Sequence, residues 1–327
     1  MDTDKKISED FLKDILTKNF LKIMPVFYEM QSTFLSGIYK RYGNLEGANI
    51  VIYFAKNLHL EILRKREDDL DFNLSLDKFW LNHKNVQQPQ HKVINVSKNT
   101  GLPKETTRRK IIELVKKKHI KKIEKNQLCW EPIDFYKDSY IKIIDEEINY
   151  LSKFIFEEKK ILNIDVPFSR IQKEIRSNFS FYWYHYLDVQ LKYMRNWQDE
   201  LKDLELLVII LQCIIQTINY MAKKKSNFDQ NSLKNFKMSK NMEFKDANIS
   251  ATSVSEVTGI PRATCIRKLE SLVKDHALRK DLSSKRYHLF LDKNNEEENL
   301  VYGRTGIKRT IEIFSNFSAV VLRALLR

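Results

Sequence analysis

The chain carries the same basic segment twice, and this internal repeat constrains its fold more than any other feature. The segment TGLPKETTRRKIIELVKK begins at Thr100, and TGIPRATCIRKLESLVKD begins at Thr258. Aligned over residues 100–122 and 258–280, ten of 23 positions are identical. NLEGANIVIY and DLELLVIILQ, and SLDKF and SLKNF, match at nearly the same spacing. Because all these matches have nearly the same offset along the chain, the sequence predicts two copies of one domain.

The size of the chain agrees with this prediction. A length of 327 residues suffices for two domains, each with its own core. We place the boundary near NIDVP, so the expected domains are residues 1–163 and 164–327, each with flanking helices. The low glycine content, seven residues, favours long helices over a turn-rich β fold.

Hydrophobic periodicity and helix-breaking residues predict the elements of the first copy. They are a helix interrupted at Pro25 and ending before Gly43, helices over 44–64 and 75–81, a short helix over 95–100, a long helix over 103–118, a hairpin starting at Ile120 and an amphipathic helix over 141–155. Pro103 suits the first helical position, because its missing N–H would have no partner there.

The second copy is expected to repeat this order. Its elements are a long helix over 171–193, a buried apolar helix over 204–215, a short helix opening on a capping-box pattern at Ser253 and Glu256, a long helix from Pro261, a hairpin with its tip at 283–285 and a final helix over 307–326. The aromatic residues Trp183, Tyr186 and Trp197 are expected to pack in the core or between the copies, with a ligand pocket as the alternative.

A short helix, a glycine turn, a long basic helix and a β-hairpin form the plan of a winged helix-turn-helix. The sequence therefore predicts a mainly α fold of two tandem winged helix-turn-helix domains, each with a small β-hairpin wing and long flanking helices. Apolar spacing assigns one face of each long helix to the core. These positions are Leu102, Thr107, Ile111 and Leu114, and in the second copy Ile260, Cys265, Leu269 and Leu272.

The charge of the chain is concentrated in the repeat. The net charge is +14 and the pI about 9.4, which favours a polyanionic partner. Residues 103–122 carry a net +7 and residues 261–280 a net +4. We therefore expect these helices to bind double-stranded DNA.

The side chains expected to contact DNA lie on the first two turns of each long helix and at the hairpin tips. Arginine can bond guanine bidentately, and threonine can meet a base edge or a phosphate. The candidates are Lys104, Thr106, Arg108, Arg109 and Lys125, and in the second copy Arg262, Thr264, Ile266, Arg267, Ser284 and Lys285. The lysines further along the first helix and its hairpin, at 116–118 and 121–122, are expected to contact phosphates or solvent.

The pattern G-[LI]-P-[KR]-x-T-x-x-R, present in both copies, resembles the recognition segment of IclR-type and MarR-type winged-helix regulators. The resemblance is local to this segment in each copy. The helices before and after the wing resemble the MarR plan, in which such helices form a dimer. The resemblance implies a transcriptional regulator. The three widely spaced cysteines fit a reducing cytoplasm, so we expect it to be cytoplasmic and nucleoid-associated. The duplication departs from both families and suggests a covalent pseudo-dimer that reads two non-identical half-sites with one chain.

Two other functions stay open. A replication initiator of the plasmid or phage kind also uses two winged helices in one chain, and some winged helices bind only protein partners. The sequence also leaves open a small-molecule effector and a further homodimer.

Several functional classes are not supported by the sequence. Three widely spaced cysteines predict neither a disulfide framework nor a metal site, and the histidines lack metal-type spacing. No catalytic motif stands out, so we expect no enzyme activity and no cofactor. The N-terminus is too charged for a signal peptide, and the most apolar run, 204–215, is too short for a membrane span.

Overall fold

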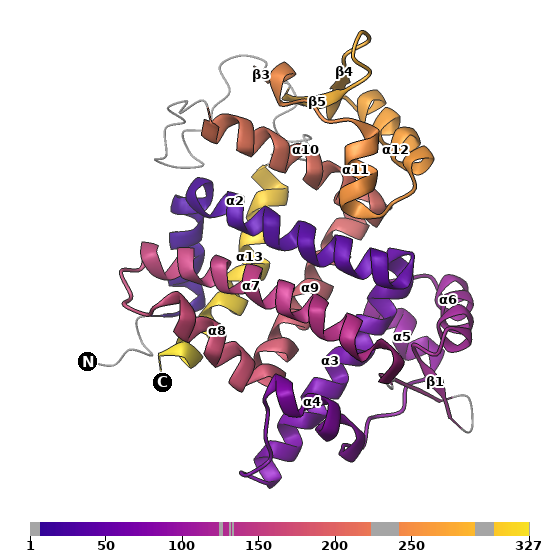
Figure 1. Ribbon diagram of the computed structural model, residues 1–327, viewed down its shortest axis with the longest axis vertical. Coiled ribbons are helices and arrows are strands. Elements are labelled where there is room, and N and C mark those ends of the chain that lie inside the picture. The colour runs from indigo at the N-terminus through magenta and orange to yellow at the C-terminus, as the bar shows by residue number, and fades with distance from the viewer. Residues whose placement is uncertain are drawn as a thin grey trace. The chain divides into compact units, whose positions relative to one another are not determined.

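The computed structural model describes residues 7–123, 127–130, 132, 134–223, 242–291 and 304–326. It is 76% helical, which confirms the mainly α class (Figure 1). The chain divides into two compact units. Unit 1 comprises Met1–Lys40, Lys153–Asp165 and Glu200–Arg327, and unit 2 comprises Arg41–Ser152 and Val166–Asp199. Each unit therefore combines segments from both halves of the sequence.

Unit 2 holds the first basic segment. Its elements are α3 (Leu45–Asp68), α4 (Leu76–Asn82), η1 (His83–Asn85), α5 (Val93–Thr100), α6 (Lys104–Lys116), β1 (Lys121–Lys122), β2 (Leu128–Cys129), η3 (Asp134–Tyr136), most of α7 (Lys137–Ile161), α8 (Phe168–Ser177) and most of α9 (Phe179–Leu201). The helix α3 packs against both α5 and α6. The expected hairpin is present, with β1 and β2 antiparallel and Lys121 opposite Cys129.

An aromatic cluster forms the core of unit 2. Phe79 of α4 stacks on His59 of α3 at 5.0 Å and meets Phe179 of α9 edge-on at 5.6 Å. Trp183 packs on Phe179 at 4.8 Å. Trp183 and Tyr186 are buried, as expected for core residues. The cluster ties α9, from the second half of the sequence, to helices of the first half.

Unit 1 holds the second basic segment. Its elements are most of α2 (Glu9–Tyr42), the end of α7, α10 (Leu204–Lys223), β3 (Met242–Glu243), η4 (Lys245–Ala247), α11 (Ala251–Thr258), α12 (Arg262–Lys274), β4 (Leu278–Lys280), β5 (Tyr287–Leu291) and α13 (Arg304–Leu325). The helix α10 packs against α11 and α12, as α3 does against α5 and α6. The expected hairpin β4–β5 gains a third strand, since β3 pairs with the other edge of β5.

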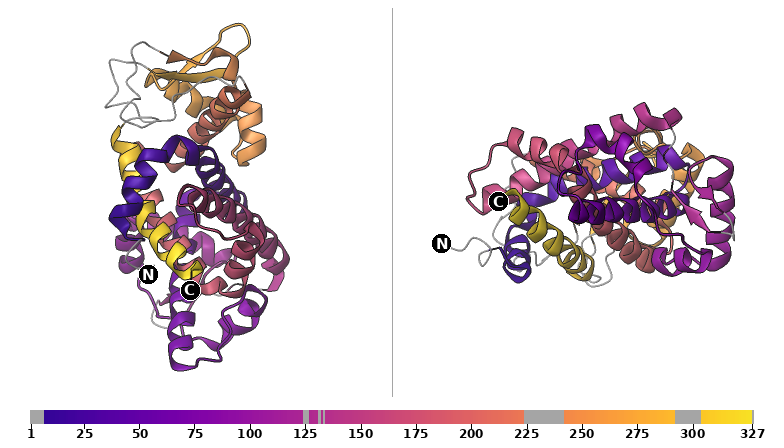
Figure 2. Two further views of the ribbon diagram at one scale, coloured as in Figure 1. Left: turned by 90° about the vertical axis from the view of Figure 1, so that its left-hand side faces the viewer. Right: turned by 90° about the horizontal axis from the view of Figure 1, so that it is seen from below.

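The remaining helices of unit 1 form a second apolar core. Figure 2 shows α13 beside the N-terminal part of α2. There Phe27 of α2 meets Phe314 of α13 edge-on at 4.9 Å and Phe154 of α7 at 6.0 Å. An ion pair between Lys13 and Glu312, 2.8 Å apart, joins the same two helices.

Two expected helices differ from the sequence prediction in where the chain leaves the helical conformation. Pro25 lies inside α2, and the non-helical residue is Asn19 (φ −114°, ψ 15°). The Asn19 side chain donates to the Ile15 carbonyl at 3.0 Å, a local bond that competes with the helix backbone. The prediction of an interruption at Pro25 was therefore wrong, whereas the end of α2 before Gly43 (φ 78°) is confirmed.

The long helix expected over 171–193 is divided into α8 and α9. Asn178 leaves the helical region (φ −111°, ψ 39°) and its carbonyl accepts the Phe181 N–H at 3.0 Å. The Ser180 N–H donates to the Leu74 carbonyl at 3.0 Å, so a tertiary hydrogen bond holds the break. The apolar positions of this segment are nevertheless buried, namely Ile171, Ile175, Phe179, Tyr182, Tyr186, Val189 and Tyr193.

The capping box expected at Ser253 was also wrong. The N-cap of α11 is Ser250, whose hydroxyl accepts the Ser253 N–H at 3.0 Å. Ser253 therefore lies inside the helix.

The apolar helix α10 is longer than the run recognised in the sequence. The segment Leu204–Met221 is long enough and apolar enough to cross a membrane, judged by length and composition alone, and 61% of it is buried inside the structure. A core helix of a water-soluble domain passes the same two criteria, so this helix is weak evidence for a membrane span.

Candidate nucleic-acid interface

The two turns that precede the basic helices have the same geometry. Gly101 ends α5 with φ 74° and ψ 4°, and Gly259 ends α11 with φ 77° and ψ −1°. Only glycine adopts this left-handed conformation without steric cost. The Gly101 N–H donates to the Ser97 carbonyl at 3.0 Å, and the Gly259 N–H donates to the Ser255 carbonyl at 2.8 Å. Each turn therefore reverses the chain in the same way.

Side-chain hydrogen bonds also recur at the spacing of the sequence repeat. Ser97 Oγ donates to the Leu102 carbonyl at 2.7 Å, and Ser255 Oγ donates to the Ile260 carbonyl at 2.7 Å. These bonds fix the start of the following helix relative to the short helix. Pro103 and Pro261 occupy the N-cap positions, one residue before the position expected for Pro103.

The two basic helices have equal length and end alike. Both α6 and α12 span 13 residues. Each is followed by a non-glycine residue in the left-handed region, Lys118 with φ 59° and His276 with φ 55°. A left-handed backbone costs a residue with a side chain roughly 1–2 kcal/mol. The same unfavourable conformation at matched positions indicates that both hairpins need this reversal.

The buried face of each helix is the one that the apolar spacing indicated. All eight expected positions are at most 5% exposed: Leu102, Thr107, Ile111, Leu114, Ile260, Cys265, Leu269 and Leu272. Cys265 Sγ donates to the Ile260 carbonyl at 3.4 Å, and burial raises the pKa of its thiol to about 11. A thiol with this pKa is protonated at neutral pH and acts as a core side chain.

The opposite face is open to solvent. None of the described candidate residues is buried: Lys104, Arg108, Arg109, Arg262, Arg267, Ser284 and Lys285 are exposed, and Thr106, Thr264 and Ile266 are half-buried. Lys125 lies outside the described residues. Because the core side chains fix the rotation of each helix, the basic face cannot turn inwards without exposing them.

The matched arginines, Arg109 and Arg267, have no polar partner among the described residues of this face. Within the described part of the chain, neither forms an ion pair or a hydrogen bond. Arg108 instead pairs with Glu105 at 2.9 Å, and Arg262 donates to Thr252 Oγ1 at 3.0 Å. An exposed, unpaired guanidinium keeps all its donors for a ligand.

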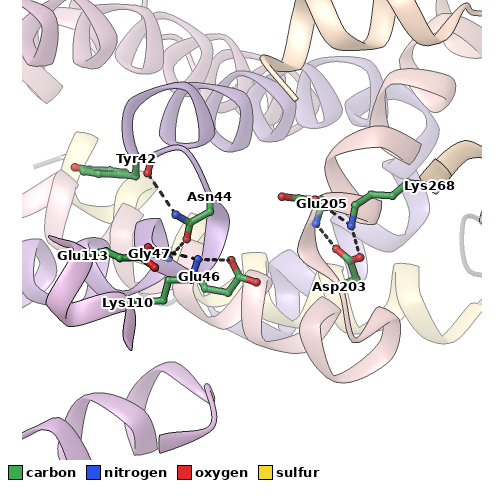
Figure 3. A network of polar contacts seen from close by, with 9 residues as sticks. All are labelled: Tyr42, Asn44, Glu46, Gly47, Lys110, Glu113, Asp203, Glu205 and Lys268. Atoms are coloured by element: carbon green, nitrogen blue, oxygen red, sulfur yellow. Dashed lines mark hydrogen bonds and ion pairs between the residues drawn. The ribbon is translucent and has the colours of Figure 1, made fainter. Parts of the chain in front are cut away.

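One lysine of each basic helix has a structural role that the sequence argument missed (Figure 3). Lys268 is 5% exposed and pairs with Asp203 and, at 3.0 Å, with Glu205, both at the start of α10. Lys110 approaches Glu46, near the start of α3, at 3.9 Å, and Glu113 at 3.8 Å. The signal was present in the sequence, since both the lysine and the acidic residue recur at nearly the same offset.

The hairpin of unit 1 ends in a fixed turn. Asp281 Oδ1 accepts the Ser283 N–H at 2.8 Å and the Ser283 hydroxyl at 2.6 Å. These hydrogen bonds lower the pKa of the Asp281 carboxyl to about 2, so it stays ionised. The turn presents Leu282, which is 86% exposed, and the cation of Lys285 to solvent.

Comparisons with family models, with curated proteins and with solved structures find no match to this chain. Among the described residues, no three His, Cys, Asp or Glu side chains are grouped so that they could hold a metal ion.

Proposed function

We propose that this chain is a transcriptional regulator that binds double-stranded DNA through two winged helix-turn-helix domains derived from a tandem duplication. In each domain the basic helix, α6 or α12, enters a major groove, and the hairpin lies against the neighbouring backbone. The main support is the pair of unpaired, exposed arginines, Arg109 and Arg267, at matched positions on helices whose opposite faces are buried.

The recurrence of the same turn supports the duplication. Independent helix-turn-helix segments would not need matched serine hydroxyl bonds, matched left-handed residues and a matched lysine held by the preceding long helix. All of these recur at, or very close to, the spacing of the sequence repeat. One molecule would thus carry two reading helices, as a pseudo-dimer.

The two reading faces differ in chemistry, so we expect the two half-sites to differ in sequence. Arg108 of α6 corresponds to Ile266 of α12, and Lys104 corresponds to Arg262. A half-buried isoleucine can contact a thymine methyl but cannot bond guanine. The preferred site is therefore asymmetric.

The decisive experiment measures DNA binding across a salt series, followed by sequencing of the selected fragments. Fluorescence anisotropy with random genomic duplexes should give an affinity that falls steeply with salt, because bound cations release counterions from DNA. A weak, salt-independent signal would instead identify a protein-binding scaffold. Selected fragments should contain single asymmetric sites; arrays of tandem repeats would favour a replication initiator.

Substitution of the matched arginines tests the assignment of the reading face. Arg109→Ala and Arg267→Ala should each weaken binding to the selected site by about 1–3 kcal/mol and relax the preference at one position. Arg170→Ala, at an exposed arginine of α8, is the matched control and should leave affinity unchanged. If the double variant keeps the wild-type footprint and affinity, the reading face has been assigned wrongly.

A further inference from the structure

A basic side chain from a long helix lies across each glycine turn. The side chain of Lys40, near the end of α2, covers Gly259: a methyl group on that glycine would lie 2.7 Å from Lys40 Cγ. The side chain of Arg195, in α9, covers Gly101, where a methyl group would lie 3.7 Å from Arg195 Cγ and 3.8 Å from Nε. At Gly259 the absence of a side chain makes room for the stem of Lys40, whereas a methyl group on Gly101 would be in ordinary van der Waals contact with Arg195.

The charged ends of both residues are available for a ligand. Lys40 and Arg195 are exposed, and in the described part of the chain neither pairs with a carboxylate. Their neighbours behave differently. Lys192, one helical turn before Arg195, pairs with Asp188 at 2.9 Å, and Lys18 of α2 pairs with Asp14 at 2.5 Å.

The covered turns lie immediately before the candidate reading faces. Gly101 precedes Lys104, the first residue of α6, by three positions, and Gly259 likewise precedes Arg262 of α12. Three residues span at most about 11 Å, so each added cation lies within reach of a phosphate flanking the same groove. The packing thus extends each basic face beyond its own helix.

Each of these cations comes from the opposite half of the sequence. Lys40 belongs to the first half and covers the turn of the second basic segment, whereas Arg195 belongs to the second half and covers the turn of the first. The two residues do not align in the repeat, so nothing in the sequence alone pairs them with the turns.

We propose that Lys40 and Arg195 are DNA-backbone contacts, each supplied to one reading helix by the other half of the chain. This inference rests on the proposed function. Their contribution is to affinity and not to sequence choice, because phosphates carry no base identity. Each half therefore contributes to binding by the other half's helix.

The test compares Lys40→Gln/Arg195→Gln with the control Lys18→Gln/Lys192→Gln, which removes the same charge from the same two helices. Glutamine retains most of the stem over the glycine. With the full chain and the selected duplex, the slope of log affinity against log salt should fall by about 0.9 per lost contact, hence by about 2 in the test variant. The control should keep the wild-type slope. Lys40→Arg should also keep it, since charge is retained.

The outcomes separate this inference from the proposed function. A test variant with the wild-type slope would overturn the inference and leave the proposed function standing. A changed sequence preference would also overturn it, because the residues would then read bases. If the wild-type chain shows no salt-dependent binding to DNA, both proposals fail.

Discussion

Replacing Lys268 with methionine should destabilise unit 1 far more than the equivalent change at Lys110 destabilises unit 2. Lys268 is 5% exposed and lies between two carboxylates at the start of α10, with Glu205 at 3.0 Å. Methionine keeps the length of the stem and removes the charge. The side chains of Asp203 and Glu205 remain 37% and 23% exposed, so water can partly re-solvate them.

The magnitudes follow from these exposures. Removal of one partner from a fully buried pair costs about 3–5 kcal/mol, and partial exposure of the partners lowers our expectation for Lys268→Met to about 2–3 kcal/mol. At Lys110 the carboxylates lie 3.8–3.9 Å away and are 43–45% exposed. The Lys110 side chain is 14% exposed, but its ion pairs are long and its partners are open to water, so Lys110→Met should cost only about 0.5 kcal/mol.

Urea unfolding followed by far-ultraviolet circular dichroism measures the loss, and hydrogen exchange of the α12 amides shows where it occurs. Lys274→Met, at an exposed lysine of the same helix, is the control and should change stability by less than about 0.5 kcal/mol. Equal losses at Lys268 and Lys110 would refute the reasoning. So would a stable Lys268→Met variant, because desolvation of the lysine would then outweigh its ion pairs.

Three further predictions concern the core, the turns and the division of the chain. Burial raises the pKa of Glu158 from 4.5 to about 8, so the free energy of unfolding should fall as pH rises through this window, by up to about 1.4 kcal/mol per pH unit. Glu158→Gln should reduce that fall, and the control Glu157→Gln should not. Parallel pH profiles of stability for wild type and Glu158→Gln would contradict this. Gly259→Ala should lower stability more than Gly101→Ala. Both substitutions incur roughly 1–2 kcal/mol for the left-handed backbone, but only the first displaces Lys40. Equal losses of stability in thermal unfolding would show that the Lys40 side chain moves aside at no cost. Two fragments made by dividing the chain after residue 163 should each fail to unfold cooperatively and should regain helicity when mixed, because each compact unit contains segments of both fragments. A cooperative transition in either fragment alone would count against this.

Local patterns predicted most of what surrounds the candidate interface. The burial of Leu114 and Leu272 and the exposure of Arg109 and Arg267 follow from helical spacing, which depends only on residues three and four positions apart. The glycine turns were predictable for the same reason, since a left-handed C-cap is a local property of the chain.

Features that depend on distant partners were not predictable in this way. The break at Asn178 is held by a hydrogen bond between Ser180 and Leu74, which lie far apart in the sequence. In the sequence, Lys268 adds to the basic charge of its helix; in the structure, its charge is paired with carboxylates at the start of α10. A lysine on a basic helix reads the same in the sequence whether it faces a phosphate or a carboxylate.

The division of the chain into compact units illustrates the same limit at a larger scale. A constant repeat spacing detects that two segments are alike, but it cannot decide which copy of an apolar face a given helix covers. The periodicity of α9 is the same whichever set of helices it covers. The choice is made by particular side chains, such as Phe179 against Phe79, and by the stem of Arg195 over Gly101. Because each compact unit combines segments from both halves, a cut at the sequence boundary removes core from both units.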